Sequence, residues 1–171
     1  GVEGQIVLGA IGTVWVLRQF VDSTISPAII ITLAILGGMI TGAIWASFAG
    51  MLKTFGGVNE IFGGLGLNFV STALTLYLIF GPWKRDGVAS MSGTEPFPDV
   101  LFLPQIPDLR ISPWALVIAL VAIVIVYFIL QGTYFGLKIK AVGKNIRAAY
   151  LLGIPTWQYS LYSFLLCGAL A

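Results

Sequence analysis

Long apolar runs constrain the fold of this chain more than any other feature. Five such segments run roughly Gln5–Phe20, Pro27 to about Leu52, Glu60–Phe80, Pro113 to about Phe135, and from Thr156 to the end of the chain. About twenty apolar residues in a helix cross a bilayer core, and a helix satisfies its own backbone groups in lipid. We therefore predict an all-α, polytopic transmembrane helix bundle with about five membrane segments.

Composition supports this prediction and excludes other classes. Of 171 residues, 58% are hydrophobic and only 9% are charged, and the mean hydropathy is +0.97. We treat residues 1–171 as one membrane domain. Because the chain lacks an initiator methionine and stops inside the last apolar segment, we expect it to be an internal piece of a longer protein.

Charged and metal-binding residues are too few for several functions. The 9 Lys and Arg against 7 Asp and Glu form no basic surface for nucleic acid, so we expect no nucleic-acid partner. Histidine is absent, and Cys167 is the one cysteine. We therefore expect no metal site, no cofactor and no catalytic residues. The Gly-Lys at Gly143 lacks the spacing of a phosphate loop, so we expect that this chain does not hydrolyse ATP by itself.

The ends of several segments carry helix boundary signals. Ser26-Pro27 and Ser112-Pro113 read as an N-cap followed by proline at the first helical position, and Gly81-Pro82 reads as a stop. Asn59 is the expected N-cap of a helix whose first turn contains Glu60.

Charge in the connecting segments predicts the orientation. Residues 136–156 contain four cations and no acid, and Lys53 follows the second segment, so we place both on the cytoplasmic side. The four cations are Lys138, Lys140, Lys144 and Arg147. The Pro-rich residues 81–112 then form an extracytoplasmic loop.

Small residues repeat along the second segment. They recur every four positions, at Gly38, Gly42, Ala46 and Gly50. This spacing puts them on one helical face, where another helix backbone can approach closely. We predict that this face packs against a helix.

Polar residues repeat along the third segment. Asn68, Thr72 and Thr75 share one face of the predicted helix. One interpretation is a wall of a substrate path, because polar groups inside a membrane are costly and often functional. The alternative is hydrogen bonding that holds helices together.

The cytoplasmic connector contains the stretch "GKNIRAAYLLGIP". We predict a short helix from Asn145, with Ala148 and Ala149 small enough for close contact, Gly153 at its end and Pro155 preventing continuation. Such a helix between two spans suits a docking surface. On composition alone, an ordinary basic loop is the favoured explanation.

This stretch resembles the coupling loop of the permeases of ABC importers. The family pattern is Glu-Ala-Ala, three residues, then Gly, and "RAAYLLG" keeps its spacing with Arg147 in the glutamate position. "AVGKNIRAAYLLGI" is similar to the form found in the branch that serves simple sugars, nucleosides and branched-chain amino acids. "GVEGQIVLGA" and "GVNEIFGGLGLNF" are similar to other segments of the sugar and nucleoside permeases.

The resemblance implies a particular assembly. Two membrane subunits, identical or related, would enclose a path, with a pair of cytoplasmic ATP-binding subunits below and an extracytoplasmic substrate-binding protein above. It implies a bacterial inner (plasma) membrane location. The expected ATPase-coupling residues are Gly143, Lys144, Asn145, Ala148, Ala149, Gly153 and Ile154, with hinges at Gly143 and Pro155. The expected path residues are Gln5, Asn68, Thr72 and Thr75.

The resulting functional hypothesis is a permease subunit of an ATP-driven importer for a nucleoside or simple sugar. Branched-chain amino acids are the alternative substrate. Two other classes stay open from the residues alone: a sodium-driven secondary transporter and a membrane scaffold protein without a path.

Overall fold

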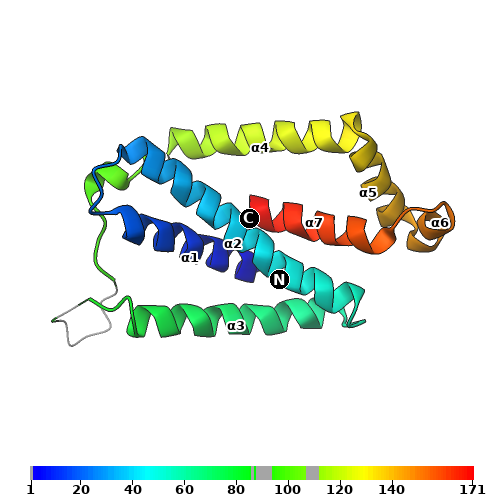
Figure 1. Cartoon of the computed structure of the whole chain (residues 1–171), viewed down its shortest axis with the longest axis horizontal. Helices are drawn as coiled ribbons and strands as arrows, with labels where there is room; N and C mark the ends of the chain where they lie inside the picture. Colours follow the sequence, from blue (N-terminus) through cyan, green and yellow to red (C-terminus); the bar gives the residue numbers. More distant parts are fainter. Residues whose placement is uncertain (1, 86, 88–93, 107–111) are drawn as a thin grey trace. The chain divides into compact units, whose positions relative to one another are not determined.

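The computed structural model describes residues 2–85, 87, 94–106 and 112–171, and in them the chain is helical without strands (Figure 1). The helices are α1 (Val2–Phe20), α2 (Pro27–Thr54), α3 (Glu60–Phe80), α4 (Pro113–Gly132), α5 (Tyr134–Lys144), α6 (Ile146–Leu151) and α7 (Thr156–Leu170), and a 3₁₀ turn covers Asp99–Leu101. The all-α prediction is confirmed. Part of the predicted outer loop, including Pro107, lies outside the described residues.

Three of these helices are long and apolar enough to cross a membrane: α2, α3 and α4. The predicted polytopic membrane fold is thus confirmed. α1 has 19 residues and a charged residue near each end, and α7 has 15 residues. For these two helices, spanning the membrane stays a prediction.

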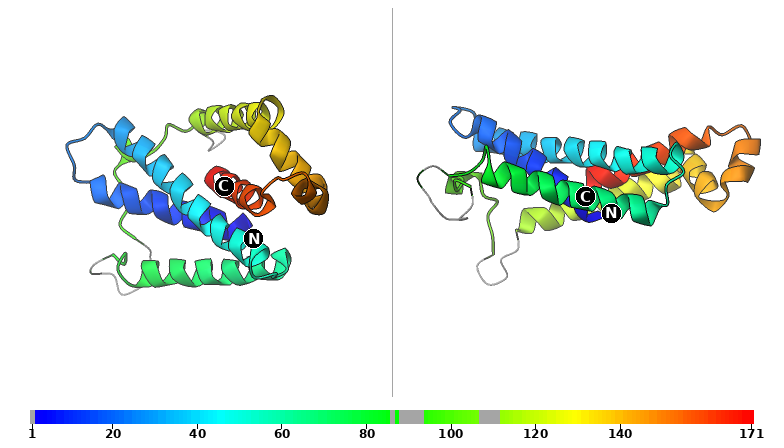
Figure 2. Two further views of the ribbon diagram at one scale, coloured as in Figure 1. Left: turned by 45° about the vertical axis from the view of Figure 1, so that its right-hand side comes forward. Right: turned by 90° about the horizontal axis from the view of Figure 1, so that it is seen from below.

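The chain divides into two compact units, residues 1–101 with 164–171, and residues 102–163. In the first unit, α1 packs along α2 and α3, and α2 runs obliquely past both (Figure 2). Glycines permit the α1–α2 contact: a Cβ on Gly38 would lie 3.1 Å from the carbonyl oxygen of Gly9. The close packing of α1 against α2 therefore depends on glycines, which let the two backbones approach, more than on large side chains.

The residues predicted to start or end helices lie at helix ends in the structure. Asn59 caps α3 by accepting a hydrogen bond from the N–H of Ile61 at 2.9 Å. Ser26 and Ser112 occupy the N-cap positions of α2 and α4 with proline following, but neither hydroxyl makes a cap hydrogen bond. Gly81 ends α3, with its N–H bonded to the carbonyl of Tyr77.

The fourth segment ends earlier than predicted. We expected it to continue to about Phe135, but α4 ends at Gly132, and Thr133 is extended, with φ −123° and ψ 152°. A separate helix, α5, then begins at Tyr134. The Thr133 side chain accepts a hydrogen bond from the N–H of Gly136, so a local cap starts a new helix where apolar composition alone suggested continuation.

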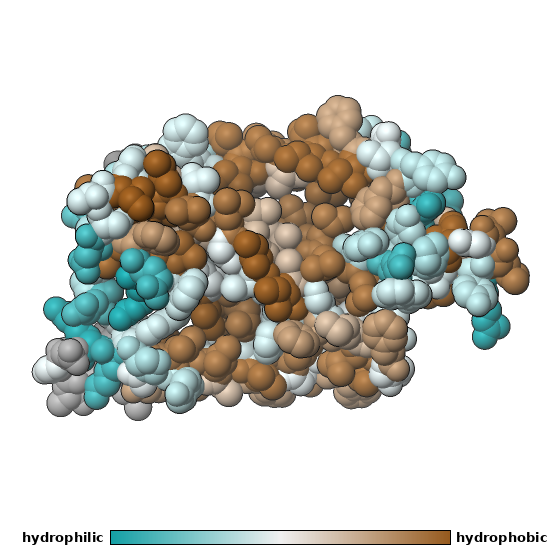
Figure 3. All heavy atoms as spheres, viewed as in Figure 1, coloured by the Kyte–Doolittle hydropathy of each residue, from teal (hydrophilic) through white to brown (hydrophobic). Residues whose placement is uncertain are grey.

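α4 exposes its apolar side chains. Of its twenty described residues none is buried within the chain, and brown, hydrophobic spheres cover most of this helix in Figure 3. Ile123 is 64% exposed and Leu120 is 62% exposed. A surface of this kind is stable in contact with lipid tails or with other membrane helices.

Candidate coupling and translocation site

Asn145 separates α5 from α6 and caps both helices. Its N–H donates to the carbonyl of Ala141 at 3.1 Å, which closes α5, and its side-chain oxygen accepts from the N–H of Ala148 at 3.0 Å, which opens α6. Its backbone is extended, with φ −158°. The predicted short helix starting from Asn145 is therefore present, and one non-helical residue joins it to α5.

Gly153 ends α6 in the left-handed region, at φ +76°. Its N–H donates to the carbonyl of Tyr150 at 2.9 Å, and the N–H of Ile154 reaches back to the carbonyl of Ala149 at 3.1 Å. This pair of bonds is a Schellman motif, which glycine adopts without the steric cost of a Cβ. The spacing of Ala149 and Gly153 in the sequence thus has a structural cause.

α6 presents apolar side chains away from its own unit. Leu151 is 84% exposed, Leu152 78% and Tyr150 70%, whereas Ala149 is 2% exposed and faces inward. Ala148, Lys144 and Arg147 are also exposed. Hydrophobic and hydrophilic spheres lie side by side on α6 at the far right of Figure 3. Such a surface favours a partner that offers an apolar floor and tolerates cations at its edge.

The other expected coupling residues flank this helix. Gly143 lies in the last turn of α5, and Lys144 is its final residue, so the chain leaves helical geometry at Asn145. A hinge at Gly143 stays a prediction. Pro155 directly precedes α7, and Ile154 lies between the two helices.

Asn68 joins two helices. Its side-chain oxygen accepts from the N–H of Gly4 at 2.9 Å, and its amide donates to a carboxylate oxygen of Glu3 at 3.1 Å. Close by, the buried Nε1 of Trp45 has no hydrogen-bond partner among the described residues. Both polar groups of the Asn68 side chain are used in fixing α1 to α3, as the interhelical interpretation requires.

The side chains of Thr72 and Thr75 make no hydrogen bond to the side chain of Asn68 in the described residues. Each hydroxyl donates to a carbonyl one turn earlier in α3, that of Asn68 at 3.0 Å and that of Ser71 at 2.8 Å. Thr72 is exposed and Thr75 is half-buried. A threonine that bonds its own helix leaves its methyl group and one oxygen lone pair toward its surroundings.

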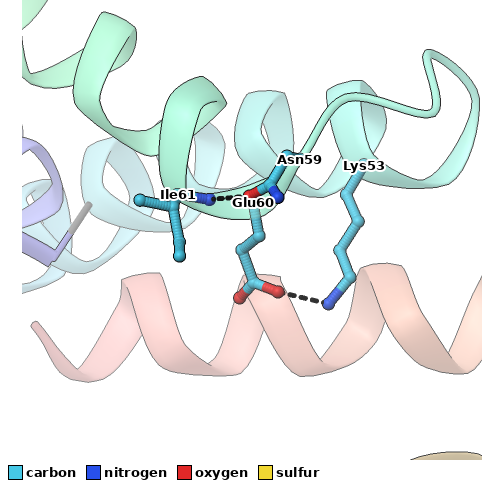
Figure 4. A network of polar contacts seen from close by, with 4 residues as sticks. All are labelled: Lys53, Asn59, Glu60 and Ile61. Carbon is cyan, nitrogen blue, oxygen red and sulfur yellow. Dashed lines mark hydrogen bonds and ion pairs between the residues drawn. The ribbon is translucent and has the colours of Figure 1, made fainter.

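Gln5 is 8% exposed and lines a cavity of about 730 Å³ between the start of α1, the end of α2 and the start of α3. Lys53 and Glu60 form an ion pair at this cavity, beside the Asn59 cap (Figure 4). Asn68, Thr72 and Thr75 are not among the lining residues. Of the four expected path residues, only Gln5 thus reaches this cavity.

The small residues of α2 face two different helices. Gly38 approaches α1, whereas Gly42 and Ala46 lie against Gly168 of α7. Gly42, Ala46 and Gly50 are buried.

Sequence reasoning missed α5 and its links. Lys138 lies over the rings of Tyr134 and Tyr159, with its Nζ 5.0 and 5.4 Å from their centroids. Phe135 also contacts the Tyr159 ring, at a centroid separation of 5.6 Å. Gly132 followed directly by Thr133, a helix-stop residue and then an N-cap residue, was an available signal for a new helix start.

A family model described as the branched-chain amino acid transport system permease component matches residues 1–171, the whole chain. The chain belongs to this family. The family is one of membrane permeases, and the three long apolar helices α2, α3 and α4 fit a multi-pass membrane protein. No solved structure matches it.

Relatives of this permease are named for sugars and nucleosides. It is 32% identical to a glucose ABC transporter permease protein of Haloferax volcanii, over 100% of this chain and 47% of the relative. It is 31% identical to a guanosine ABC transporter permease protein of Bacillus subtilis, and 27% identical to a nucleoside ABC transporter permease protein of Lactococcus lactis, over 100% of this chain and 49% and 48% of those relatives. The chain spans about half the length of these relatives.

Proposed function

We propose that this chain belongs to the membrane subunit of an ATP-driven importer and that α6 is its coupling helix. The observation that carries the proposal is the form of α6: a short helix capped at both ends, with Tyr150, Leu151 and Leu152 exposed at its tip. If ATP is bound and hydrolysed in another subunit, hydrolysis can change the conformation of the membrane subunit only through a contact between the two.

The proposed partners follow from this role. Cytoplasmic ATP-binding subunits receive α6, a second permease subunit completes the path, and an extracytoplasmic substrate-binding protein delivers the substrate. From Thr133 to the end of the chain there is no acid, while Lys144 and Arg147 flank the α6 tip. We therefore expect an apolar cleft with acidic residues at its rim on the ATP-binding subunit.

The proposed substrate is a nucleoside or a simple sugar. The relatives named for glucose and guanosine support this class. The uncharged amide of Gln5, which lines the cavity, suits a polyol or a base better than a charged ligand. The family description supports branched-chain amino acids as the second candidate.

Reconstitution tests the proposal. The full-length permease, with the ATP-binding subunits and the binding protein encoded beside it, is placed in proteoliposomes, and uptake of guanosine, glucose and leucine is compared with and without ATP. ATP-dependent uptake of guanosine or glucose is expected. ATP-dependent uptake of leucine, without uptake of guanosine or glucose, would make branched-chain amino acids the substrate class. Uptake driven by a sodium gradient without ATP would contradict the proposed ATP-driven importer.

A further inference from the structure

The cavity beside Gln5 lies inside one compact unit of the chain. All its lining residues belong to the unit of residues 1–101 and 164–171, and they come from the start of α1, the end of α2, the start of α3 and one turn of α7. Its volume of about 730 Å³ is in the range of sites that hold small molecules. The cavity is therefore large enough to be a ligand site formed by a single permease chain.

The side chain of Gln5 is buried without a partner. It is 8% exposed and lines the cavity, and its amide makes no hydrogen bond to any residue in the described part of the chain. A buried amide that forms no hydrogen bond costs free energy, and native structures rarely keep one without a reason. The amide has an acceptor oxygen beside a donor nitrogen, so a ligand with a neighbouring donor and acceptor would satisfy both.

The charges at the cavity cancel. Among the described lining residues the two charged ones are Lys53 and Glu60, and they pair with each other (Figure 4). The Nζ of Lys53 also lies over the ring of Phe164, 5.6 Å from its centroid, so the ion pair and the ring are held together. A cavity with balanced charges favours an uncharged ligand, because a charged one would be desolvated without a counter-ion.

Much of the remaining wall is apolar. Val2, Ala49, Val58 and the ring of Phe164 line the cavity. A sugar carries a hydroxyl on nearly every carbon, and each buried hydroxyl needs a partner that these side chains do not offer. A nucleobase has flat apolar faces and hydrogen-bonding groups along its edge, which suit an apolar and aromatic wall that contains one amide.

Polar groups at the turn before α3 complete the lining. Asn59 uses its side-chain oxygen to cap α3, and its side-chain nitrogen makes no hydrogen bond to the described residues. The carboxylate of Glu60 has a second oxygen besides the one paired with Lys53. These groups can donate to and accept from hydroxyls, so they suit the ribose of a nucleoside.

We propose that this cavity binds a nucleoside, with the amide of Gln5 at the edge of the base, Phe164 beside the base, and Asn59 and Glu60 near the ribose hydroxyls. The inference rests on the proposed transport of a nucleoside or a simple sugar, and it selects the nucleoside. Gln5 is then a specificity-determining residue. Because every lining residue comes from this chain, the site needs no residue of a second permease subunit.

Guanosine binding to the assembled transporter tests the site. The full-length permease with its ATP-binding subunits is placed in lipid nanodiscs without the binding protein, and radiolabelled guanosine is titrated. We expect saturable binding that unlabelled guanosine displaces and that glucose and ribose do not displace at the same concentration. The absence of saturable guanosine binding, or equal displacement by glucose, would overturn the inference.

Gln5→Leu separates recognition from folding. It removes both groups that bond the base, so guanosine affinity should fall about tenfold or more. Because the amide of Gln5 has no partner to lose, the thermal unfolding midpoint without guanosine should be unchanged or higher in this variant. An unchanged affinity would overturn the role of Gln5. A lower midpoint would mean that Gln5 bonds inside the protein, and it would remove the unpartnered amide on which the site rests.

Two alanines provide a test that leaves Gln5 in place. Ala49 lines the cavity, whereas Ala73 on α3 is exposed and does not line it. Ala49→Leu fills part of the cavity and should weaken guanosine binding about fivefold or more, while Ala73→Leu should leave it unchanged. Equal guanosine affinities in the two variants would overturn the site, even if Gln5→Leu does not assemble.

Uptake measurements keep this inference apart from the proposed function. ATP-dependent uptake of glucose by a transporter that binds no guanosine would leave the proposed function standing and remove the nucleoside site. Guanosine binding that depends on Gln5, together with uptake that does not need ATP, would support the site and contradict the ATP-driven importer.

Discussion

Gly42 of α2 and Gly168 of α7 lie backbone to backbone, so that a Cβ added to either residue would overlap the carbonyl of the other. Ala46, one turn further along α2, completes the contact with Gly168. Close approach of this kind is what membrane helices use where apolar burial gives no net driving force. The crossing of α2 and α7 therefore depends on the absence of side chains at two positions.

Gly42→Ala should destabilise this crossing by about 1–3 kcal/mol, the usual cost of overpacking. Gly66→Ala is the matched control, because a Cβ there would meet nothing within 4 Å among the described residues, and alanine favours a helix by about 1 kcal/mol. Thermal unfolding midpoints in detergent should fall for the first variant and hold or rise for the second. Equal midpoints would contradict the close crossing.

Asn68→Leu should destabilise the α1–α3 contact by about 1–3 kcal/mol, because it leaves the N–H of Gly4 and the carboxylate of Glu3 without their partner. Thr72→Val removes only a bond within α3 and should cost less. The same unfolding assay ranks the two. If Asn68→Leu unfolds like the parent protein but alters uptake, Asn68 acts in the substrate path and not in packing.

Gly153→Val should weaken coupling, because a β-branched residue is strongly disfavoured at φ +76° and would distort the end of α6. Gly153→Asn should retain more activity, since asparagine tolerates the left-handed region. Uptake per ATP hydrolysed is measured for both variants. Similar ratios in both would show that the conformation at Gly153 does not control coupling.

Two residues at the start of α3, Asn59 and Glu60, should contribute small and unequal amounts to the free energy of unfolding. Asn59→Ala removes the cap of α3 and should cost about 1 kcal/mol. Glu60→Gln removes the ion pair with Lys53. The side chain of Lys53 is 44% exposed and that of Glu60 is 58% exposed, so the loss should cost less than about 1 kcal/mol. Chemical denaturation in detergent compares them. A larger loss from Glu60→Gln would mean that the ion pair matters more than its exposure indicates.

Local features of the fold were predictable from sequence. The apolar runs predicted the three long membrane helices, and Asn59 was the expected cap of α3 because its side chain can accept a nearby backbone hydrogen bond. A short helix starting from Asn145 was also expected. The end of α6 at Gly153 followed from the same local chemistry. Each of these features involves residues close together in the chain.

Contacts between distant residues were not predictable. Asn68 and Glu3 are 65 positions apart, and no periodicity in either segment pairs them. Hydropathy also placed the end of α4 too late, because Phe135 is apolar whether it continues a span or packs on Tyr159. The face carrying Asn68, Thr72 and Thr75 was recognised, but their separate hydrogen-bond partners depend on the packed helices.

The central claim is that α6 docks into an ATP-binding subunit, and a cysteine cross-link scan tests it most directly. In the full-length protein with Cys167→Ser, single cysteines at positions 148–152 are paired with cysteines along the cleft of the ATP-binding subunit encoded beside it. We expect cross-links strongest at the exposed Leu151 and Leu152, and changing with bound nucleotide. Absence of cross-links in an intact complex would contradict the coupling role of α6.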